Sequence, residues 1–384
     1  MRSAAYAVIL TLSGTKRKDL RISLKSAICT FAIALTWATS TPAQVATGIP
    51  PFGSFSGGPD IVNNGNLNVH IAIPIVRKAG RGTPFTYILS YDSSVWFPSI
   101  SSGTNTWTGV ANWGWRGQTE VSTGYVSNTV TTAKWCLIGG VYYGTQFTYS
   151  NWTYHDTFGT PHAFSGSTKV SVSHSTSCPT SSTSLTATTT DGSGWTLSAT
   201  GNTTNSVTSV GGQVLHPPAV NSQTGAGSFT DPNGNTISVS SSGVFTDTLG
   251  MSALTVTGSG TQASPLVYTY TAAGNVSQQI TVKYTDTNIK TNFGCSGVAE
   301  YTASSVPLVT EIDLPNSTSY TFGYEATPGN PGYFTGRLIS ITLPTGGTIS
   351  YTYTGGGSGN INCADGSAAG LQRTLNGAGV STGT

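Results

Sequence analysis

The sequence predicts an all-β protein built from antiparallel hairpins and repeat-type sheets. Only 8% of its 384 residues are charged, whereas aromatic residues make up 10% and glycine occurs 48 times. Thr, Val, Ile, Tyr, Phe and Trp favour strands, and Gly, Asn and Pro favour the turns between them. A coiled coil or a helical bundle needs many more Ala, Glu, Lys and Leu at helical spacing. No segment after the first 43 residues shows a helical period with caps, so we expect no helices of note.

Apolar and polar residues alternate at period two from one end of the chain to the other. The alternation is clearest at 68–73, 85–89, 236–240, 266–270, 279–284 and 348–353. This pattern points one set of side chains inward and leaves Thr and Ser facing water. About 340 residues follow the first segment, which is more than a single core usually serves, so we expect two packed β regions.

Residues 1–43 have the features of a Sec signal peptide. Basic residues at 16–18 and 25 precede an apolar stretch over 27–38, and small residues follow at 41–43. The apolar stretch is shorter than the roughly 20 residues that span a bilayer. We therefore expect cleavage after this segment and a secreted or cell-surface protein without a further membrane span. An uncleaved N-terminal anchor is the alternative. Because the bases concentrate here, the rest of the chain has no basic face for nucleic acid.

Export changes the interpretation of the cysteines. Cys29 belongs to the signal segment, and the mature chain keeps an even number in an oxidising compartment, namely Cys136, Cys178, Cys295 and Cys363. Three connectivities are possible, and neighbourhood in the sequence favours 136 with 178 and 295 with 363. A zinc site is the alternative, but the chain has no Cys-x-x-Cys pair and no His within three residues of these cysteines. We expect structural disulfides, with no metal and no cofactor.

Turn signals of one form separate the predicted strands. An Asp followed by two residues and usually a Gly occurs at 156–159, 191–194, 231–234, 247–250 and, in a weaker form, 313–316. Asp can accept hydrogen bonds from the N–H groups that follow it, and Gly supplies the positive φ of a tight hairpin. We expect Asp156, Gly159, Asp231 and Gly234 to set turns and strand register as parts of degenerate repeats.

Composition divides the mature chain into four regions. Residues 44–165 hold most of the Trp and many large apolar residues, and residues 229–355 carry most of the turn repeats. Residues 166–228 are rich in Ser and Thr and predict either a connector or exposed strands. Residues 356–384 have few apolar anchors, so we expect disorder beyond Cys363.

Groups that could perform chemistry are few. His155, Asp156 and His162 could form a metal or acid–base site, although neighbouring residues on a strand point to opposite faces, which favours a structural interpretation. The glutamates are scattered, and the sequence cannot place two at the separation that a glycosidase needs. No Gly-x-Ser-x-Gly motif precedes a helix. These observations predict a protein that is not an enzyme, with a secreted hydrolase as the alternative.

Aromatic residues offer a further interpretation. Trp113 and Trp115 are two residues apart, so on a strand they would share one face. An exposed pair of this kind could stack on sugar rings, which makes a carbohydrate-binding or adhesin module the alternative function. Trp is more often buried in β cores, where it supplies much of the apolar area.

Several short motifs resemble those of secreted RHS (YD-repeat) proteins. Gly-Asn-Leu, Ile-Pro-Ile, Gly-Arg-Gly and Leu-Ser-Tyr-Asp-Ser, which resemble the opening of these proteins, occur at 65–67, 73–75, 80–82 and 89–93. Near the other end, Tyr-Phe-Thr-Gly-Arg-Leu at 333–338, followed by Gly-Gly at 346–347 and Tyr-Thr-Tyr at 351–353, resembles one YD repeat. Phe334 stands where the repeat has Asp, and one spacer residue is missing.

The resemblance implies a β shell wound from strand–turn–strand repeats, in which Gly336 and Arg337 set turns and register. It implies an N-terminal portion or a truncated member of the family. The expected function is that of a non-enzymatic structural shell or interaction segment of a larger repeat polypeptide. Its expected partners are the rest of that polypeptide or glycans of the cell envelope and surface.

Overall fold

The computed structural model describes residues 54–56, 59–101, 103–116, 118–356 and 359–376. The expected signal segment, including Cys29, lies outside the described residues. The described residues belong to one compact unit. They form strands with three single-turn helical segments, η1 (Ala111–Gly114), α2 (Glu120–Thr123) and η2 (Ala273–Asn275). No helix in this part of the chain is long and apolar enough to cross a membrane. The expectation of an all-β fold made of antiparallel sheets is confirmed.

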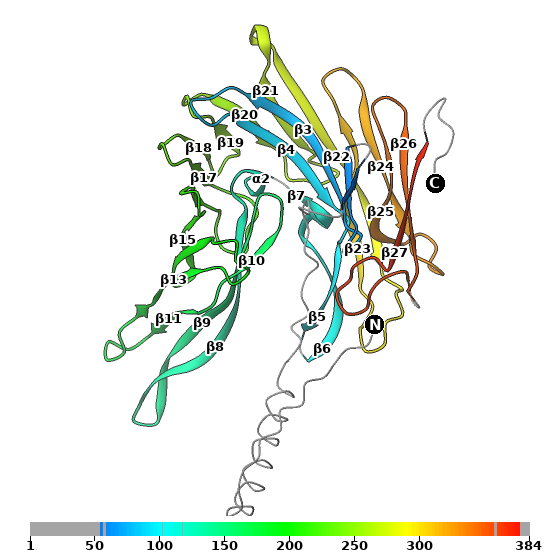
Figure 1. The fold of residues 1–384 in the computed structure, drawn as a ribbon. Coiled ribbons are helices and arrows are strands. Elements are labelled where there is room, and N and C mark those ends of the chain that lie inside the picture. The colour runs from blue at the N-terminus through cyan, green and yellow to red at the C-terminus, as the bar shows by residue number, and fades with distance from the viewer. Residues whose placement is uncertain (1–53, 57–58, 102, 117, 357–358, 377–384) are drawn as a thin grey trace, which may run out of the picture. The chain divides into compact units, whose positions relative to one another are not determined.

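The largest sheet has 15 strands, whose order in space follows their order in the sequence (Figure 1). Its strands are β13 (Ser184–Thr188), β14 (Thr196–Thr200), β15 (Thr203–Thr208), β16 (Val214–His216), β17 (Gly227–Thr230), β18 (Thr236–Val239), β19 (Val244–Thr246), β20 (Ser252–Thr257), β21 (Leu266–Thr271), β22 (Ser277–Lys290), β23 (Thr302–Asp313), β24 (Ser319–Ala326), β25 (Phe334–Thr342), β26 (Thr348–Thr354) and β27 (Gly370–Asn376). Each pairs antiparallel with the next, and β22 also meets β25 in parallel at Ile289 and Phe334. The sheet is therefore a meander of hairpins.

Asp-x-x-Gly turns join several of these neighbouring strands. Asp231 follows β17, and its Oδ1 accepts hydrogen bonds from the N–H groups of Asn233 and Asn235, each at 2.9 Å. Gly234 has a φ of +81°. Asp247 repeats the arrangement between β19 and β20. A side-chain acceptor thus closes the loop, and the glycine takes the left-handed conformation that reverses the chain.

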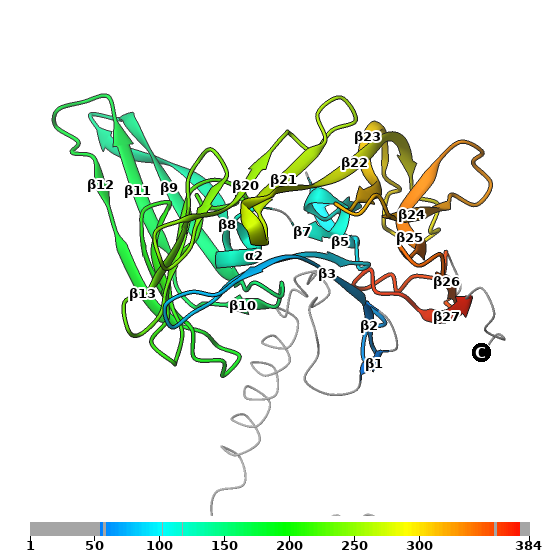
Figure 2. The same cartoon turned by 90° about the horizontal axis from the view of Figure 1, so that it is seen from above.

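A five-stranded sheet packs against this meander (Figure 2). Its strands, in spatial order, are β1 (Ser54–Ser56), β2 (Asp60–Asn63), β3 (Val69–Lys78), β4 (Phe85–Asp92) and β7 (Trp115–Arg116). The separate hairpin of β5 (Trp96–Ser101) and β6 (Thr104–Gly109) follows β4 in the chain. The ring of Tyr87 on β4 lies 5.4 Å from that of Tyr268 on β21. Phe85 and Tyr87, which alternate on β4, also pack against Phe245 on β19, with ring centroids 6.0 and 5.3 Å apart, so aromatic side chains hold the two sheets together.

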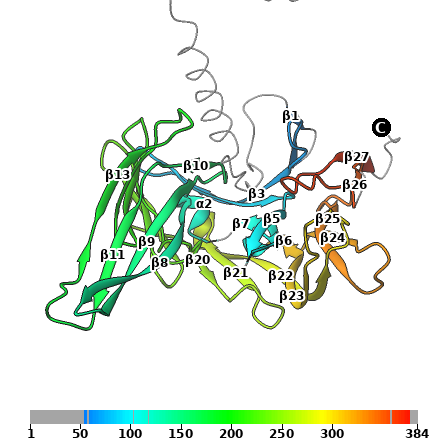
Figure 3. The same ribbon diagram turned by 90° about the horizontal axis from the view of Figure 1, so that it is seen from below.

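A buried ion pair connects the two ends of the described chain. The guanidinium of Arg373 on β27 donates to both carboxylate oxygens of Asp60 on β2, at 2.6 and 2.7 Å. The hydroxyl of Tyr351 on β26 donates to the same carboxylate at 2.8 Å. Figure 3 shows β1 and β3 near β26 and β27.

The third sheet is built around one long hairpin. It comprises β8 (Tyr125–Ile138), β9 (Val141–His155), β10 (Pro161–Ala163), β11 (Thr168–Ser173) and β12 (Ser181–Ser182). β9 pairs with β8, β10 and β11, and β11 pairs with β12. Residues 168–182 of the Ser/Thr-rich region form β11 and β12 of this sheet, and the rest of the region contributes β13 to β16 to the large sheet, with Leu197, Val207 and Leu215 buried.

Buried apolar residues form two clusters. The larger joins residues 62–115 to residues 237–361, and the smaller lies within residues 126–215. The Trp-rich region therefore does not pack as one block, because Trp96, Trp107 and Trp115 enter the first cluster whereas Trp152 enters the second. Each sheet must bury its apolar face against another layer. The part of the Trp-rich region before about residue 120 packs in the larger cluster, and the part after it packs in the smaller one.

The expectation of disorder beyond Cys363 is wrong for Gly370–Asn376. These residues form β27, which pairs with β26 along its whole length. Leu371 and Leu375 are partly buried against the larger cluster, and Arg373 reaches Asp60. The ladder and these anchors outweigh the polar composition. Residues 377–384 lie outside the described part.

Two disulfides link Cys136 with Cys178 and Cys295 with Cys363, with Cα atoms 6.0 and 5.6 Å apart. These are the pairings that neighbourhood in the sequence favours. The first ties β8 to the loop between β11 and β12, and the second ties the loop after β22 to the loop before β27. Two disulfides fit a protein of an oxidising, extracellular environment.

Candidate functional site

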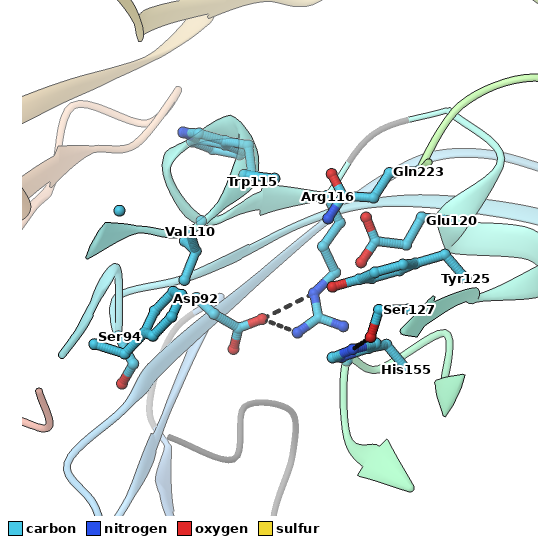
Figure 4. A pocket seen from close by; sticks show the side chains of 15 residues that line it. Asp92, Ser94, Val110, Trp115, Arg116, Glu120, Tyr125, Ser127, His155 and Gln223 are labelled. Carbon is cyan, nitrogen blue, oxygen red and sulfur yellow. Dashed lines mark hydrogen bonds and ion pairs between the residues drawn. The ribbon is translucent and has the colours of Figure 1, made fainter. Parts of the chain in front are cut away.

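A cavity of about 260 Å³ lies where β4, β7, α2, β8 and β9 meet (Figure 4). We call it the Arg116 pocket. Its polar lining includes Asp92, Arg116, Glu120, Ser127 and His155, together with Tyr125 and Gln223. The lining residues come from segments as far apart in the sequence as Asp92 and Gln223. Folding therefore brings these side chains together.

Asp92 and Arg116 form the charged base of the pocket, and both side chains are buried. Asp92 Oδ1 accepts hydrogen bonds from Asn68 Nδ2 at 2.7 Å and from His70 Nδ1 at 3.1 Å. Its Oδ2 accepts from Arg116 Nε at 2.9 Å and also from Nη2. Burial alone would raise the pKa of Asp92, but Arg116 and then His70 and Asn68 lower it to about 2. Asp92 is thus an ionised anchor whose two oxygens are both engaged.

Glu120 is the carboxyl group of the pocket that lacks such partners. It lies on α2, is only 3% exposed, and its Oε2 has no hydrogen-bond partner among the described residues. Burial raises the pKa of Glu120 to about 7, with Arg116 opposing the rise and Asp92 adding to it. A buried carboxyl group that titrates near neutrality and faces a cavity is a typical feature of functional sites.

Ser127 and His155 face each other across β8 and β9. Ser127 Oγ and His155 Nε2 form a hydrogen bond of 3.0 Å, and the ring of Tyr125 stacks on His155 with centroids 4.2 Å apart. Burial, followed by the charge of Arg116, lowers the pKa of His155 to about 4. No carboxylate of the described chain bonds the other ring nitrogen, so this pair lacks the orienting member of a catalytic triad.

Gly159 explains how the guanidinium of Arg116 fits. It has a φ of +81°, and an added Cβ atom would overlap the guanidinium. Asp156 Oδ1 closes the same turn by accepting hydrogen bonds from Phe158 at 2.9 Å and Thr160 at 2.8 Å. The turn expected at 156–159 therefore has a second consequence, because it forms one wall of the pocket.

The residues considered for a metal or acid–base site have separate partners. His155 points to Ser127, whereas His162 Nδ1 bonds Asp191 Oδ2 at 2.6 Å and its Nε2 lies 3.5 Å from Asp156 Oδ2. Burial lowers the pKa of His162, but its bonds to the two aspartates outweigh this effect and raise it. The structure therefore does not bring His155 and His162 together around one ligand.

Trp113 and Trp115 do not form the exposed platform that was the alternative to burial in the core. Trp115 is 5% exposed and packs against Phe322, with ring centroids 4.9 Å apart. Trp113 lies in η1 with a φ of +53° and packs against Trp96. The two rings do not share a strand face, because the backbone turns between them. Packing these rings in the apolar core stabilises the fold because it removes their apolar surface from water.

Gly336 and Arg337 lie inside β25, so the expectation that they set a turn is wrong. Gly336 has a φ of +78° and lies against the ring of Trp113. Arg337 is buried and binds Glu325 through Nε at 2.8 Å and Nη2 at 2.9 Å. It also donates to the carbonyl groups of residues 359 and 360, and it stacks on Tyr353 at 4.2 Å. The positive φ of Gly336 lets this side chain turn inward.

Sequence reasoning missed Asp92, Arg116, Glu120 and Ser127 as site residues. The sequence did contain a signal for two of them. Only 8% of the residues are charged, so a charged residue within the Trp-rich segment is unusual and indicates a specific partner or role. That signal would have selected Arg116 and Glu120, but not their partners.

Comparison of the sequence with known protein families and with curated proteins found no match. The fold and the site therefore define the class, which is a disulfide-linked all-β protein with a buried polar pocket.

Proposed function

We propose that the chain is a non-enzymatic, exported β protein of the YD-repeat type, working as a structural shell or interaction segment of a larger repeat polypeptide. The observation that carries this proposal is the role of Arg337 in the Gly-Arg-Leu motif. Its guanidinium joins Glu325 on β24 to the loop at residues 359 and 360 and covers Tyr353 on β26. These structural contacts of Arg337 support the proposal, because a motif of a structural repeat acts through packing.

Other buried charges of the described chain support a structural role. Asp60 with Arg373 and Asp92 with Arg116 each connect strands that are distant in the sequence. A buried pair of this kind strongly penalises any register that separates its members, since one charge would remain buried alone. At the pocket, Asp92 is already engaged at both oxygens, which leaves no second free carboxylate opposite Glu120 for glycoside hydrolysis.

An immunoblot of the source cells tests the export and the larger polypeptide. An antibody against this chain should detect, in the envelope or medium, a protein heavier than the 39.5 kDa of the chain. Without reductant, both disulfides should be intact by mass spectrometry. A reduced cytosolic protein of the chain's own mass would overturn the proposal.

An activity panel tests the absence of catalysis. Ester, glycoside and peptide substrates should show no turnover that depends on the pocket. Turnover that Ser127→Ala or Glu120→Gln abolishes, while the exposed change Asp286→Asn leaves it intact, would establish an enzyme instead.

Carbohydrate binding is a second candidate, and the unpartnered Oε2 of Glu120 favours it. A polyhydroxylated ligand both donates and accepts, so it would complement the carboxyl group of Glu120, the amide of Gln223 and the hydroxyl of Ser127. The cavity of about 260 Å³ is suited to one sugar unit. Calorimetric titration with monosaccharides should show binding that Glu120→Gln weakens at least tenfold and Asp286→Asn leaves unchanged. A panel without any binding would exclude this candidate.

A further inference from the structure

The end of the β8–β9 hairpin exposes large apolar side chains to solvent. The side chains are between 39% and 57% exposed, and they belong to Leu137, Ile138, Val141, Tyr142 and Tyr143. We call these five residues the apolar tip. Leu137 pairs with Tyr142 and Ile138 with Val141 across the hairpin, so the exposed groups are contiguous. Soluble proteins rarely leave such a patch in water unless it meets a partner.

The apolar tip is held in place by the surrounding structure. The Cys136–Cys178 disulfide fastens β8 just before the tip, and β11 pairs with β9 from Gly144 onward. The turn itself is Gly139-Gly140, and an added Cβ on either glycine would meet no atom within 4 Å. The tip therefore projects into open space on a fixed support, so little ordering is required when it binds.

Side chains along the hairpin follow a definite order from the turn. Ile138 and Val141 come first, Leu137 and Tyr142 second, and Trp135 and Lys134 further back. At about 3.4 Å per strand residue, the aliphatic residues lie within roughly 7 Å of Gly139 along the strands, and the backbone of Lys134 lies roughly 17 Å from it. Membrane interfaces combine the same groups, with aliphatic side chains reaching about 5–10 Å into the acyl boundary and with aromatic rings and basic groups at the headgroups. The ammonium group of Lys134 extends towards the ring of Tyr142, so these two polar ends lie together.

Charge around the apolar tip favours an anionic surface. From Val121 to His155 the sequence contains no Asp or Glu, and its one charged residue is Lys134. The ammonium group of Lys134 lies 5.6 Å from the ring centre of Tyr142. Lys169 on β11 pairs opposite Thr148, away from the tip, so Lys134 is the positive charge that lies next to it. No carboxylate on the hairpin would repel anionic headgroups.

We propose that the apolar tip inserts into the interface of an anionic lipid bilayer, with Lys134 at the level of the headgroups. This interaction surface is independent of the Arg116 pocket and of the role proposed for Arg337. The same exposed groups could instead meet a second copy of the chain, and the experiment separates these occupants.

Flotation of the full exported chain with lipid vesicles tests the proposal. The chain should float with vesicles of phosphatidylcholine and phosphatidylglycerol, and less with phosphatidylcholine alone. The double variant Leu137→Ser/Val141→Ser should lose at least about tenfold in partitioning because two aliphatic groups no longer leave water. Lys134→Gln should lose about fivefold on the anionic vesicles only.

The matched control changes exposed valines elsewhere. Val210 and Val276 are 78% and 51% exposed, so the double variant Val210→Ser/Val276→Ser removes similar apolar surface. Its partitioning should equal that of the wild-type chain. Absence of flotation, or an equal loss in the control, would overturn the proposal. A dimer that dissociates in Leu137→Ser/Val141→Ser would also overturn it, and would make the tip a self-association surface.

Discussion

Glu120→Gln should remove a pH-dependent loss of stability that the Arg116 pocket causes. The pKa of Glu120 rises from 4.5 to about 7 on folding, mainly because its carboxylate would be buried. The folded state therefore favours the protonated acid. The stability that protonation provides is fully present below about pH 4.5 and is lost as the pH rises through about 7. A shift of this size corresponds to about 3 kcal/mol. Glutamine keeps the shape of the neutral acid and cannot ionise.

His155 acts in the opposite direction, so the wild-type profile alone would be ambiguous. Its pKa falls from 6.5 to about 4 on folding because burial disfavours the imidazolium. The stability associated with neutral His155 is present above about pH 6.5 and is lost as the pH falls through about 4. Both proteins contain His155, so the difference between Glu120→Gln and wild type isolates Glu120.

Urea unfolding followed by tryptophan fluorescence measures this difference. The variant's advantage in unfolding free energy should grow by about 3 kcal/mol between about pH 4.5 and about pH 8. Glu300→Gln, a change at an exposed glutamate, is the matched control. A difference between Glu120→Gln and wild type that stays constant over this range would refute the reasoning, because it would mean that burial does not oppose ionisation of Glu120.

Three further outcomes follow from the contacts described above. Arg337→Met should cost about 3 kcal/mol in urea unfolding because it leaves the partly buried carboxylate of Glu325 with the hydroxyl of Thr335 but without its guanidinium partner, and adding Glu325→Leu should recover most of that loss. Gly159→Ala should destabilise more than Gly234→Ala in thermal unfolding: both glycines have a φ of +81°, but only the first Cβ displaces Arg116, and equal losses would contradict this placement. Replacing both cysteines of the disulfide at β8 with serine should cost about 4 kcal/mol, measured by urea unfolding against the disulfide-intact chain.

Turn chemistry was predictable from the sequence because it is local. The Asp231 carboxylate bonds N–H groups two and four residues further on, and Gly234 supplies the left-handed φ. The resemblance to a YD repeat misplaced Gly336 in a turn, whereas its positive φ lies inside a strand and turns Arg337 inward. A local signal for positive φ does not say whether the chain reverses or only bends.

The pocket was not predictable because its parts come from separate segments. Asp92 ends β4, Glu120 lies on α2, and Ser127 and His155 lie on paired strands. The alternation of each segment shows that one of its faces is buried, but not which other segment covers that face. For the same reason Trp115, which could be an exposed or a core residue from its spacing, was decided only by Phe322 packing against it.

The sequence by itself determined the all-β class, the hairpin turns and the favoured disulfide pairings, because strand periodicity, Asx turns and loop closure act over short or covalently connected stretches. Only the tertiary structure decided which strands share a core, that β27 is ordered, and which charges are buried together. Burial is a property of surfaces that meet across the fold, and the cost of an unpaired buried charge depends on neighbours that no local pattern names.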